Sequence, residues 1–139
     1  MTVVLDASAA LAWLFGRDDK AERKRADTML DALAEDGGLV PALWHSEVCN
    51  ALVVAERRKI ASEAQSTDFL TRLNALPIDT DSAPMQTRRD IVLELARRFT
   101  LSVYDAAYLE LALRSDARLA SFDRQLVAAM RKAGGKVFD

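Results

Sequence analysis

Four acidic residues occupy positions where most of the surrounding sequence is apolar. Asp6 ends the first apolar run of the chain, and Asp123 follows the run "RLASF". Glu47 and Asp105 lie in stretches of helical character, and most of their neighbours three and four positions away are apolar, so both acids are expected on or beside a buried face. An unpaired buried carboxylate is costly, so acids in such positions usually pair with a cation or bind a metal.

If these four carboxylates converge, they repel one another unless a positive charge lies among them. Oxygen ligands suit Mg²⁺ or Mn²⁺, whereas zinc prefers His and Cys, of which the chain has one each, His45 and Cys49. Acids that hold divalent ions are a recurring arrangement for phosphodiester hydrolysis, because the ions bind the phosphate, activate a water and offset charge on the leaving oxygen. The acids therefore indicate metal-dependent hydrolysis without a covalent nucleophile.

Asp6 and Asp123 also have a purely structural interpretation. Each stands where a strand is expected to lead into a helix, and an aspartate at a helix N-cap commonly accepts a hydrogen bond from a backbone amide of the first turn. A serine lies two residues from each acid, Ser8 and Ser121. These hydroxyls could cap the helices instead and leave both carboxylates free.

Structural alternatives exist for Glu47 and Asp105 as well. Ser102 precedes Asp105 by three residues, the spacing of a pair that resembles a capping box and favours an acid in the first turn. Glu47 could form an ion pair with an arginine such as Arg97 or Arg98. The sequence leaves these alternatives open.

Short apolar runs alternate with longer helical stretches along the chain. Strands are predicted at 2–6, 39–41, 77–79, 118–122 and 136–138, and helices at 8–15, 18–35, 42–59, 62–76, 82–98, 103–113 and 124–133. This alternation predicts an α/β three-layer sandwich, with a central, mainly parallel sheet of about five short strands flanked by helices. Ligands of such sheets gather beyond the carboxyl ends of the strands, where Asp6 and Asp123 are expected.

Composition restricts the setting of this chemistry. The 139 residues match the usual size of one domain, and 50% of them are hydrophobic, which is enough for a substantial core. The single cysteine cannot form an internal disulfide, no apolar run approaches the roughly 20 residues of a membrane span, and no charged leader precedes the first strand. We expect a soluble, cytoplasmic protein without membrane contact.

Nucleic-acid contacts would have to come from local basic groups, because the net charge is only −2. The candidates are the runs at 20–25, 57–59 and 88–89, each of which could equally be a solvated helix face. Tyr104 precedes Asp105 and could stack on a base or belong to the core.

The segments "VVLDASAAL", "SEVCNAL", "VYDAAYLELAL" and "LASFD", in this order and at these separations, resemble the PIN-domain ribonucleases. The closest resemblance is to the VapC-type toxins of bacterial toxin–antitoxin pairs. It spans essentially the whole chain, 1–139, as one PIN-like nuclease domain. The resemblance implies a PIN fold and endonucleolytic cleavage of RNA that depends on Mg²⁺ or Mn²⁺ and leaves a 5′-phosphate and a 3′-hydroxyl.

The resemblance also assigns roles to individual residues. The catalytic and metal-binding quartet would be Asp6, Glu47, Asp105 and Asp123, with Asp6 and Asp105 as the principal ligands. Three polar residues would support the quartet. Ser8 would orient a water or a phosphate, Asn50 matches a polar position that the family frequently has, and Ser121 keeps the hydroxyl of a frequent threonine.

Partners follow from the same resemblance. They are an RNA substrate, a cognate VapB-type antitoxin whose arginine would enter the acidic site, and a second copy of the chain in a homodimer or a toxin–antitoxin hetero-oligomer. Two alternatives remain: a housekeeping PIN ribonuclease without an antitoxin, and a non-catalytic PIN module that binds RNA or protein. A phosphoryl receiver, a D-x-D phosphatase and a glycine-loop nucleotide enzyme are disfavoured because the chain lacks their motifs.

Overall fold

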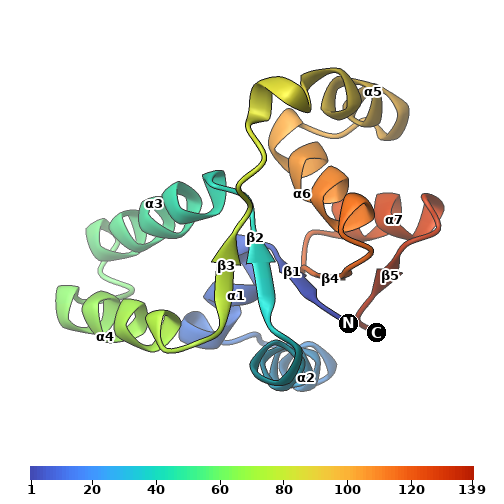
Figure 1. Cartoon of the computed structure of the whole chain (residues 1–139). Helices are drawn as coiled ribbons and strands as arrows, with labels where there is room; N and C mark the ends of the chain where they lie inside the picture. Colours follow the sequence, from blue (N-terminus) through green and yellow to red (C-terminus); the bar gives the residue numbers. More distant parts are fainter.

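A five-stranded, all-parallel sheet lies at the centre of the computed structural model, which describes residues 1–139, and seven helices flank it (Figure 1). The strands are β1 (Val3–Leu5), β2 (Gly38–Val40), β3 (Ile78–Thr80), β4 (Arg118–Ala120) and β5 (Lys136–Val137). The helices are α1 (Ala7–Phe15), α2 (Lys20–Asp36), α3 (Leu43–Arg57), α4 (Glu63–Asn74), α5 (Arg89–Phe99), α6 (Val103–Arg114) and α7 (Arg124–Lys132). The predicted α/β fold is confirmed.

The strand order is β3-β2-β1-β4-β5, so the chain builds one half of the sheet outward from β1 and then returns to build the other half from β4. The direction of winding therefore reverses between β1 and β4, which are paired in register from Val3 opposite Arg118 to Leu5 opposite Ala120. A reversal of this kind leaves a crevice at the carboxyl ends of the two strands. The segments that follow β1 and β4 both enter that crevice.

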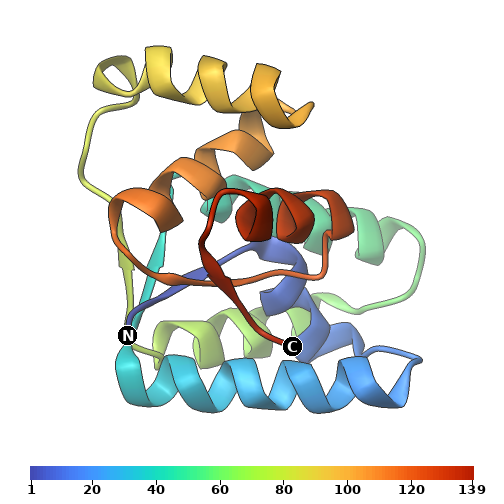
Figure 2. The ribbon, with the colours of Figure 1, turned by 90° about the vertical axis from the view of Figure 1, so that its right-hand side faces the viewer.

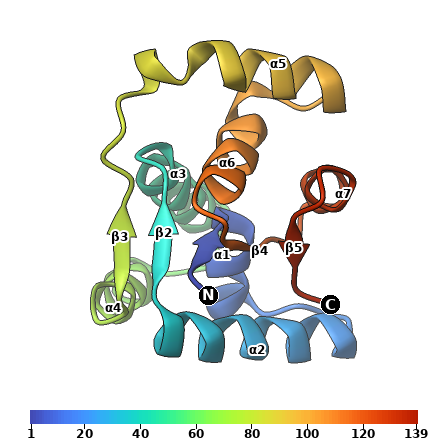
Figure 3. The same ribbon diagram turned by 45° about the vertical axis from the view of Figure 1, so that its right-hand side comes forward.

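Helices cover both faces of the sheet. In Figure 1, α1, α3 and α4 lie on one side, α6 and α7 lie on the other, and α5 packs outside α6. Helix α2 runs along the lower ends of the strands (Figure 2), and Figure 3 shows α6 and α7 above β4 and β5. None of the helices combines the length and the apolar composition that a bilayer-spanning segment needs.

The core is centred on β1, whose three residues Val3, Val4 and Leu5 are fully buried. A strand that is apolar at every position is typical of a parallel sheet with helices on both faces, as found here. By contrast, the edge strand β3 has two exposed residues among its three. Because β1 is packed on both faces, the backbone of the next residue, Asp6, has a fixed position.

The helix predicted at 82–98 begins later than expected, at Arg89. Pro84 disfavours a helical backbone at the preceding residue, and a short 3-10 turn, Met85–Thr87, follows it instead. The Thr87 hydroxyl donates to the Pro84 carbonyl at 2.7 Å and stabilises this turn.

Candidate active site

Asp6 lies directly after β1 and stands at the N-cap position of α1, but its carboxylate does not cap the helix. Instead, its Oδ2 atom accepts hydrogen bonds from the Ser8 and Ser121 hydroxyls, each at 2.7 Å. The side chain is buried, and this desolvation raises the pKa of Asp6 against the opposing effect of the two hydroxyls. The capping interpretation is therefore wrong for this residue.

Ser8 and Ser121 each connect Asp6 to the backbone that follows β4. The Ser8 hydroxyl accepts a hydrogen bond from the Phe122 amide at 2.9 Å, and the Ser121 hydroxyl accepts one from the Asp123 amide at 3.0 Å. Neither serine caps a helix in the way that the sequence left open. They hold the two central strand ends together through a single carboxylate.

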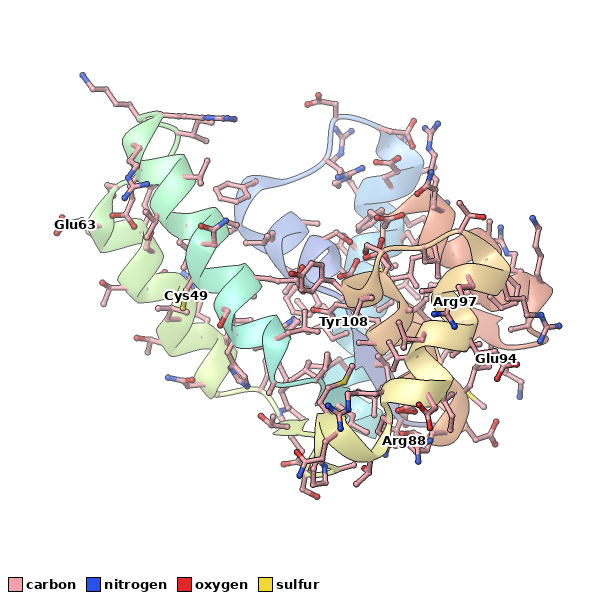
Figure 4. The ribbon with its side chains drawn as sticks, turned by 90° about the horizontal axis from the view of Figure 1, so that it is seen from above. Cys49, Glu63, Arg88, Glu94, Arg97 and Tyr108 are labelled. Atoms are coloured by element: carbon pink, nitrogen blue, oxygen red, sulfur yellow. The ribbon has the colours of Figure 1, made fainter.

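Glu47, on α3, accepts a short hydrogen bond at 2.6 Å from the Tyr108 hydroxyl to Oε1. Tyr108 is fully buried on α6, and Figure 4 shows it near the centre of the view from above, where α6 faces α3. Burial raises the pKa of Glu47, the tyrosine lowers it, and the charge of Asp6 raises it further. The alternative ion pair between Glu47 and Arg97 or Arg98 is not formed.

Tyr108 is a member of the site that the sequence analysis did not assign. A tyrosine in a nearly apolar helix usually belongs to the core, so its residue type alone indicates no role in the site. The available signal was its spacing: three residues after Asp105, it shares that residue's face of α6 and carries a hydroxyl into a buried region.

Asp105 lies in the first turn of α6, and the Ser102 hydroxyl caps that helix by accepting the Asp105 amide at 3.1 Å. The predicted cap is therefore present. Burial and the charges of the acids Asp123, Asp6 and Glu47 raise the pKa of Asp105 to about 6. These mutual effects show that the fold brings all four predicted acids into one electrostatically coupled cluster.

Asp123 has the structural role that the sequence left open and takes part in the cluster as well. Its Oδ1 atom caps α7 by accepting the Leu126 amide at 3.1 Å. Its charge nevertheless raises the pKa values of Asp6 and Asp105. The cap therefore uses Oδ1 of Asp123, and Oδ2 does not take part in that hydrogen bond.

Asn50, the remaining predicted supporting residue, is exposed on α3, one turn after Glu47, and no hydrogen bond joins it to the four acids. His45 is also exposed and forms a hydrogen bond between Nε2 and the Thr80 hydroxyl at 2.8 Å. Cys49 is an exposed free thiol. Of the three supporting residues, the structure therefore joins only the two serines to the acids.

The charged neighbours that shift Asp6, Glu47 and Asp105 are all acids, so no lysine or arginine balances the cluster. Its donors are carboxylate oxygens, the type that Mg²⁺ and Mn²⁺ prefer, and this chemistry fits such an ion. In the present arrangement no group of three or more His, Cys, Asp or Glu side chains is positioned to hold a metal ion. The four acids therefore supply the right type of donor, but no three of their side chains meet at one point.

Comparison with known proteins agrees with this fold. Residues 3–132 match the family model of the PIN domain. Among solved structures, the chain is similar to the crystal structure of PAE2754 from Pyrobaculum aerophilum, with a TM-score of 0.66 and 24% sequence identity over 93% of this chain and 87% of that chain. At this level of identity the similarity concerns the fold. No curated protein is significantly similar in sequence.

Proposed function

The chain belongs to the PIN-domain family of nucleases, and from this premise we propose that it is an endoribonuclease dependent on Mg²⁺ or Mn²⁺ and acts as the toxin of a type II toxin–antitoxin pair. One observation carries the catalytic part of the proposal. Four carboxylates from four separate segments lie within electrostatic range of one another, and no cation is among the charges that shift their pKa values. Strained electrostatics of this kind usually mark a functional site, because a structural cluster would contain its own counter-charges.

In the proposed reaction, Asp6, Glu47, Asp105 and Asp123 hold the divalent ion, with Asp6 and Asp105 as the principal ligands. When bound, such an ion would compensate the charge of the scissile phosphate and lower the pKa of an attacking water. The protein's own contribution is positioning: Ser8 and Ser121 fix the Asp6 carboxylate.

Tyr108 fixes Glu47 in the same way, through a hydroxyl that stays protonated because burial and the Glu47 bond raise its pKa. The Tyr108 hydroxyl is therefore a permanent donor at neutral pH. Neither a serine nor the cysteine is needed as a nucleophile.

The toxin role is argued from a cavity on the helix that also carries Glu47. An apolar cavity of about 160 Å³ lies between α3 and α4, lined by residues that include Trp44, Val48, Leu73 and Ile78. We propose that an antitoxin segment bound there continues around α3 toward Glu47, where an arginine would supply the missing positive charge. Exposed Val53 and Leu70 on the same two helices are candidate contacts in a homodimer.

The catalytic proposal is tested by incubating the purified protein with mixed cellular RNA, with and without Mg²⁺ or Mn²⁺, and sequencing the new 5′ ends. We expect cleavage that requires the ion and is lost in Asp6→Asn. Asp116→Asn is the matched control, since Asp116 is an exposed turn residue with a left-handed backbone that asparagine also adopts. Cleavage by Asp6→Asn at the wild-type rate would refute the assignment.

The toxin role has a separate test. The product of the small reading frame adjacent to this one is co-purified with the protein, and RNA cleavage by the complex is measured. We expect inhibition, and recovery of cleavage when the arginines of the partner's C-terminal tail are replaced by alanine. An active nuclease without such a partner would be a housekeeping enzyme.

A further inference from the structure

One arginine lies near the acidic cluster and is held in place without being used to neutralise it. Arg17 follows Gly16, which ends α1 with a left-handed φ of 74°. The Arg17 guanidinium carbon lies 4.6 Å from the centroid of the Phe122 ring, and its Nε donates to Glu22 at 2.7 Å. The side chain is 35% exposed, so the guanidinium is both fixed and accessible.

Phe122 places this arginine at the rim of the site. It stands between Ser121, which binds Asp6, and Asp123, which belongs to the cluster, and its own amide binds Ser8. Arg17 is not among the charges that shift Asp6, Glu47 or Asp105. Arg17 therefore contacts the residue between Ser121 and Asp123, and its positive charge is not used to balance the acids.

Four other arginines are engaged in structural contacts. Arg88 and Arg114 bind Glu110, Arg131 binds Asp139, and Arg118 stacks on Phe138. By contrast, the one ion pair of Arg17 uses Nε and leaves both Nη groups outside that bond.

The backbone around Arg17 is itself anchored. Arg23 donates to the carbonyls of Arg17 and Asp18, at 3.3 and 3.0 Å. The loop between α1 and α2 thus presents a guanidinium whose stem, stacking partner and backbone are all fixed.

We propose that Arg17 binds a backbone phosphate of the RNA strand next to the scissile one, an inference that rests on the proposed ribonuclease function. A cluster of four acids repels a polyanion, so a strand that crosses it needs a nearby cation on the flank. A planar guanidinium with two free Nη groups matches phosphate oxygens, and its contacts with Phe122 and Glu22 reduce the ordering that binding would otherwise require. Such a contact gives affinity and register but no sequence preference.

The test measures RNA binding separately from cleavage. Affinity for a short single-stranded oligouridylate is measured by fluorescence anisotropy in the Asp6→Asn background, between about 50 and 200 mM salt. Added Arg17→Ala should weaken binding about five- to tenfold and lower the slope of log affinity against log salt by about one. Arg72→Ala, which also removes an arginine ion-paired to an acid, is the control and should leave both quantities unchanged.

A second variant, at Glu22, separates phosphate binding by Arg17 from a purely structural role. Glu22→Gln removes the neutralising acid and keeps the arginine, so we expect it to tighten RNA binding more than Glu35→Gln at the other end of α2 does. Unchanged affinity and salt slope in a folded Arg17→Ala protein, or weaker binding by Glu22→Gln, would overturn the proposal. Absence of metal-dependent cleavage by the wild-type chain would instead refute the ribonuclease function, whatever Arg17 does.

Discussion

The two ends of α6 treat buried negative charge in opposite ways. Near its C-terminal end, Glu110 is only 4% exposed but binds two arginines, Arg88 at 3.2 Å and Arg114 at 2.9 Å. Arg114 continues to Asp81 at 2.7 Å and holds the pKa of that carboxyl below its usual range. At the N-terminal end, the charged groups that act on Asp105 are all acids, and the pKa of Asp105 is raised. Figure 4 labels one residue from each cluster, Arg88 and Tyr108.

This difference distinguishes a structural cluster from a candidate functional cluster on the same helix. The cluster around Glu110 satisfies its own charges and joins α6 to the segments before α5, so it completes the fold. The cluster around Asp105 is unbalanced and is expected to be balanced only by something that binds. Buried charges without partners are destabilising and are usually retained at functional sites.

The largest expected effect is on cleavage. Asp105→Asn should lower the rate of metal-dependent RNA cleavage at least about 100-fold, because a site built on charge stabilisation loses one of its principal oxygens. Glu110→Gln, the same type of change at the other end of the helix, should leave the rate within about twofold. Equal losses in both variants, measured with a fluorogenic RNA, would remove the functional distinction between the two clusters.

Stability should respond in the reverse order. Glu110→Gln leaves two arginines around a neutral amide, and we expect the free energy of unfolding to fall by about 2 kcal/mol in urea titrations at pH 7. The estimate is moderate because both arginines are partly exposed and can return to water. A change below about 0.5 kcal/mol would mean that the network has little structural value.

Tyr108→Phe tests the link between α3 and α6 inside the acidic cluster. Loss of the hydroxyl frees the Glu47 carboxylate, and we expect the affinity for Mn²⁺ to weaken about tenfold. The affinity is measured by calorimetry in protein that retains Asp6. Leu111→Ile, a conservative change to a buried residue of the same helix, controls for packing. An unchanged affinity would show that Glu47 does not depend on Tyr108.

The smallest expected effect is on the pH dependence of stability. The free energy of unfolding should change with pH in opposite directions for the two clusters. Because the folded pKa of Asp105 is raised from 3.8 to about 6, the native state binds its proton more tightly, and the metal-free protein loses stability as pH rises through that window. Asp105→Asn should remove this loss and stabilise the protein at pH 7 by about 1 kcal/mol, a value reduced for partial exposure to solvent.

Asp81 has a lowered pKa, so its contribution is present above the unfolded value of 3.8 and is lost as pH falls below it. Urea titrations across pH 3 to 7 in EDTA would separate the two trends. The free energy of unfolding of the wild type could instead rise from pH 4 to 6, with the same pH dependence in Asp105→Asn. This result would contradict the claim that the charge of the acidic cluster is uncompensated.

The sequence predicted the elements of the fold well because their signals are local. An unbroken apolar strand such as β1 and the serine cap before Asp105 follow from a few adjacent residues. The misplaced start of α5 has a local cause too, because the helical pattern was extended through Pro84 although proline limits the residue before it.

Side-chain contacts between segments that are distant in the sequence cannot be predicted from local patterns. Glu110 is an acid in the same nearly apolar helix as Asp105, and it is the more buried of the two, but the pattern alone does not tell which of them has a cation. Arg114 is visible at the helical spacing of four residues, whereas Arg88 comes from a different segment. For the same reason, the bond between Tyr108 and Glu47 needed coordinates to be found.

The two serine bonds to Asp6 have a stereochemical consequence. Both hydroxyls converge on Oδ2, and each is polarised by a backbone amide behind it. Asp6 therefore offers an approaching cation one oxygen in place of a chelating pair. Such a monodentate contact suits a small octahedral ion and disfavours Ca²⁺, which has a wider shell and often takes both carboxylate oxygens.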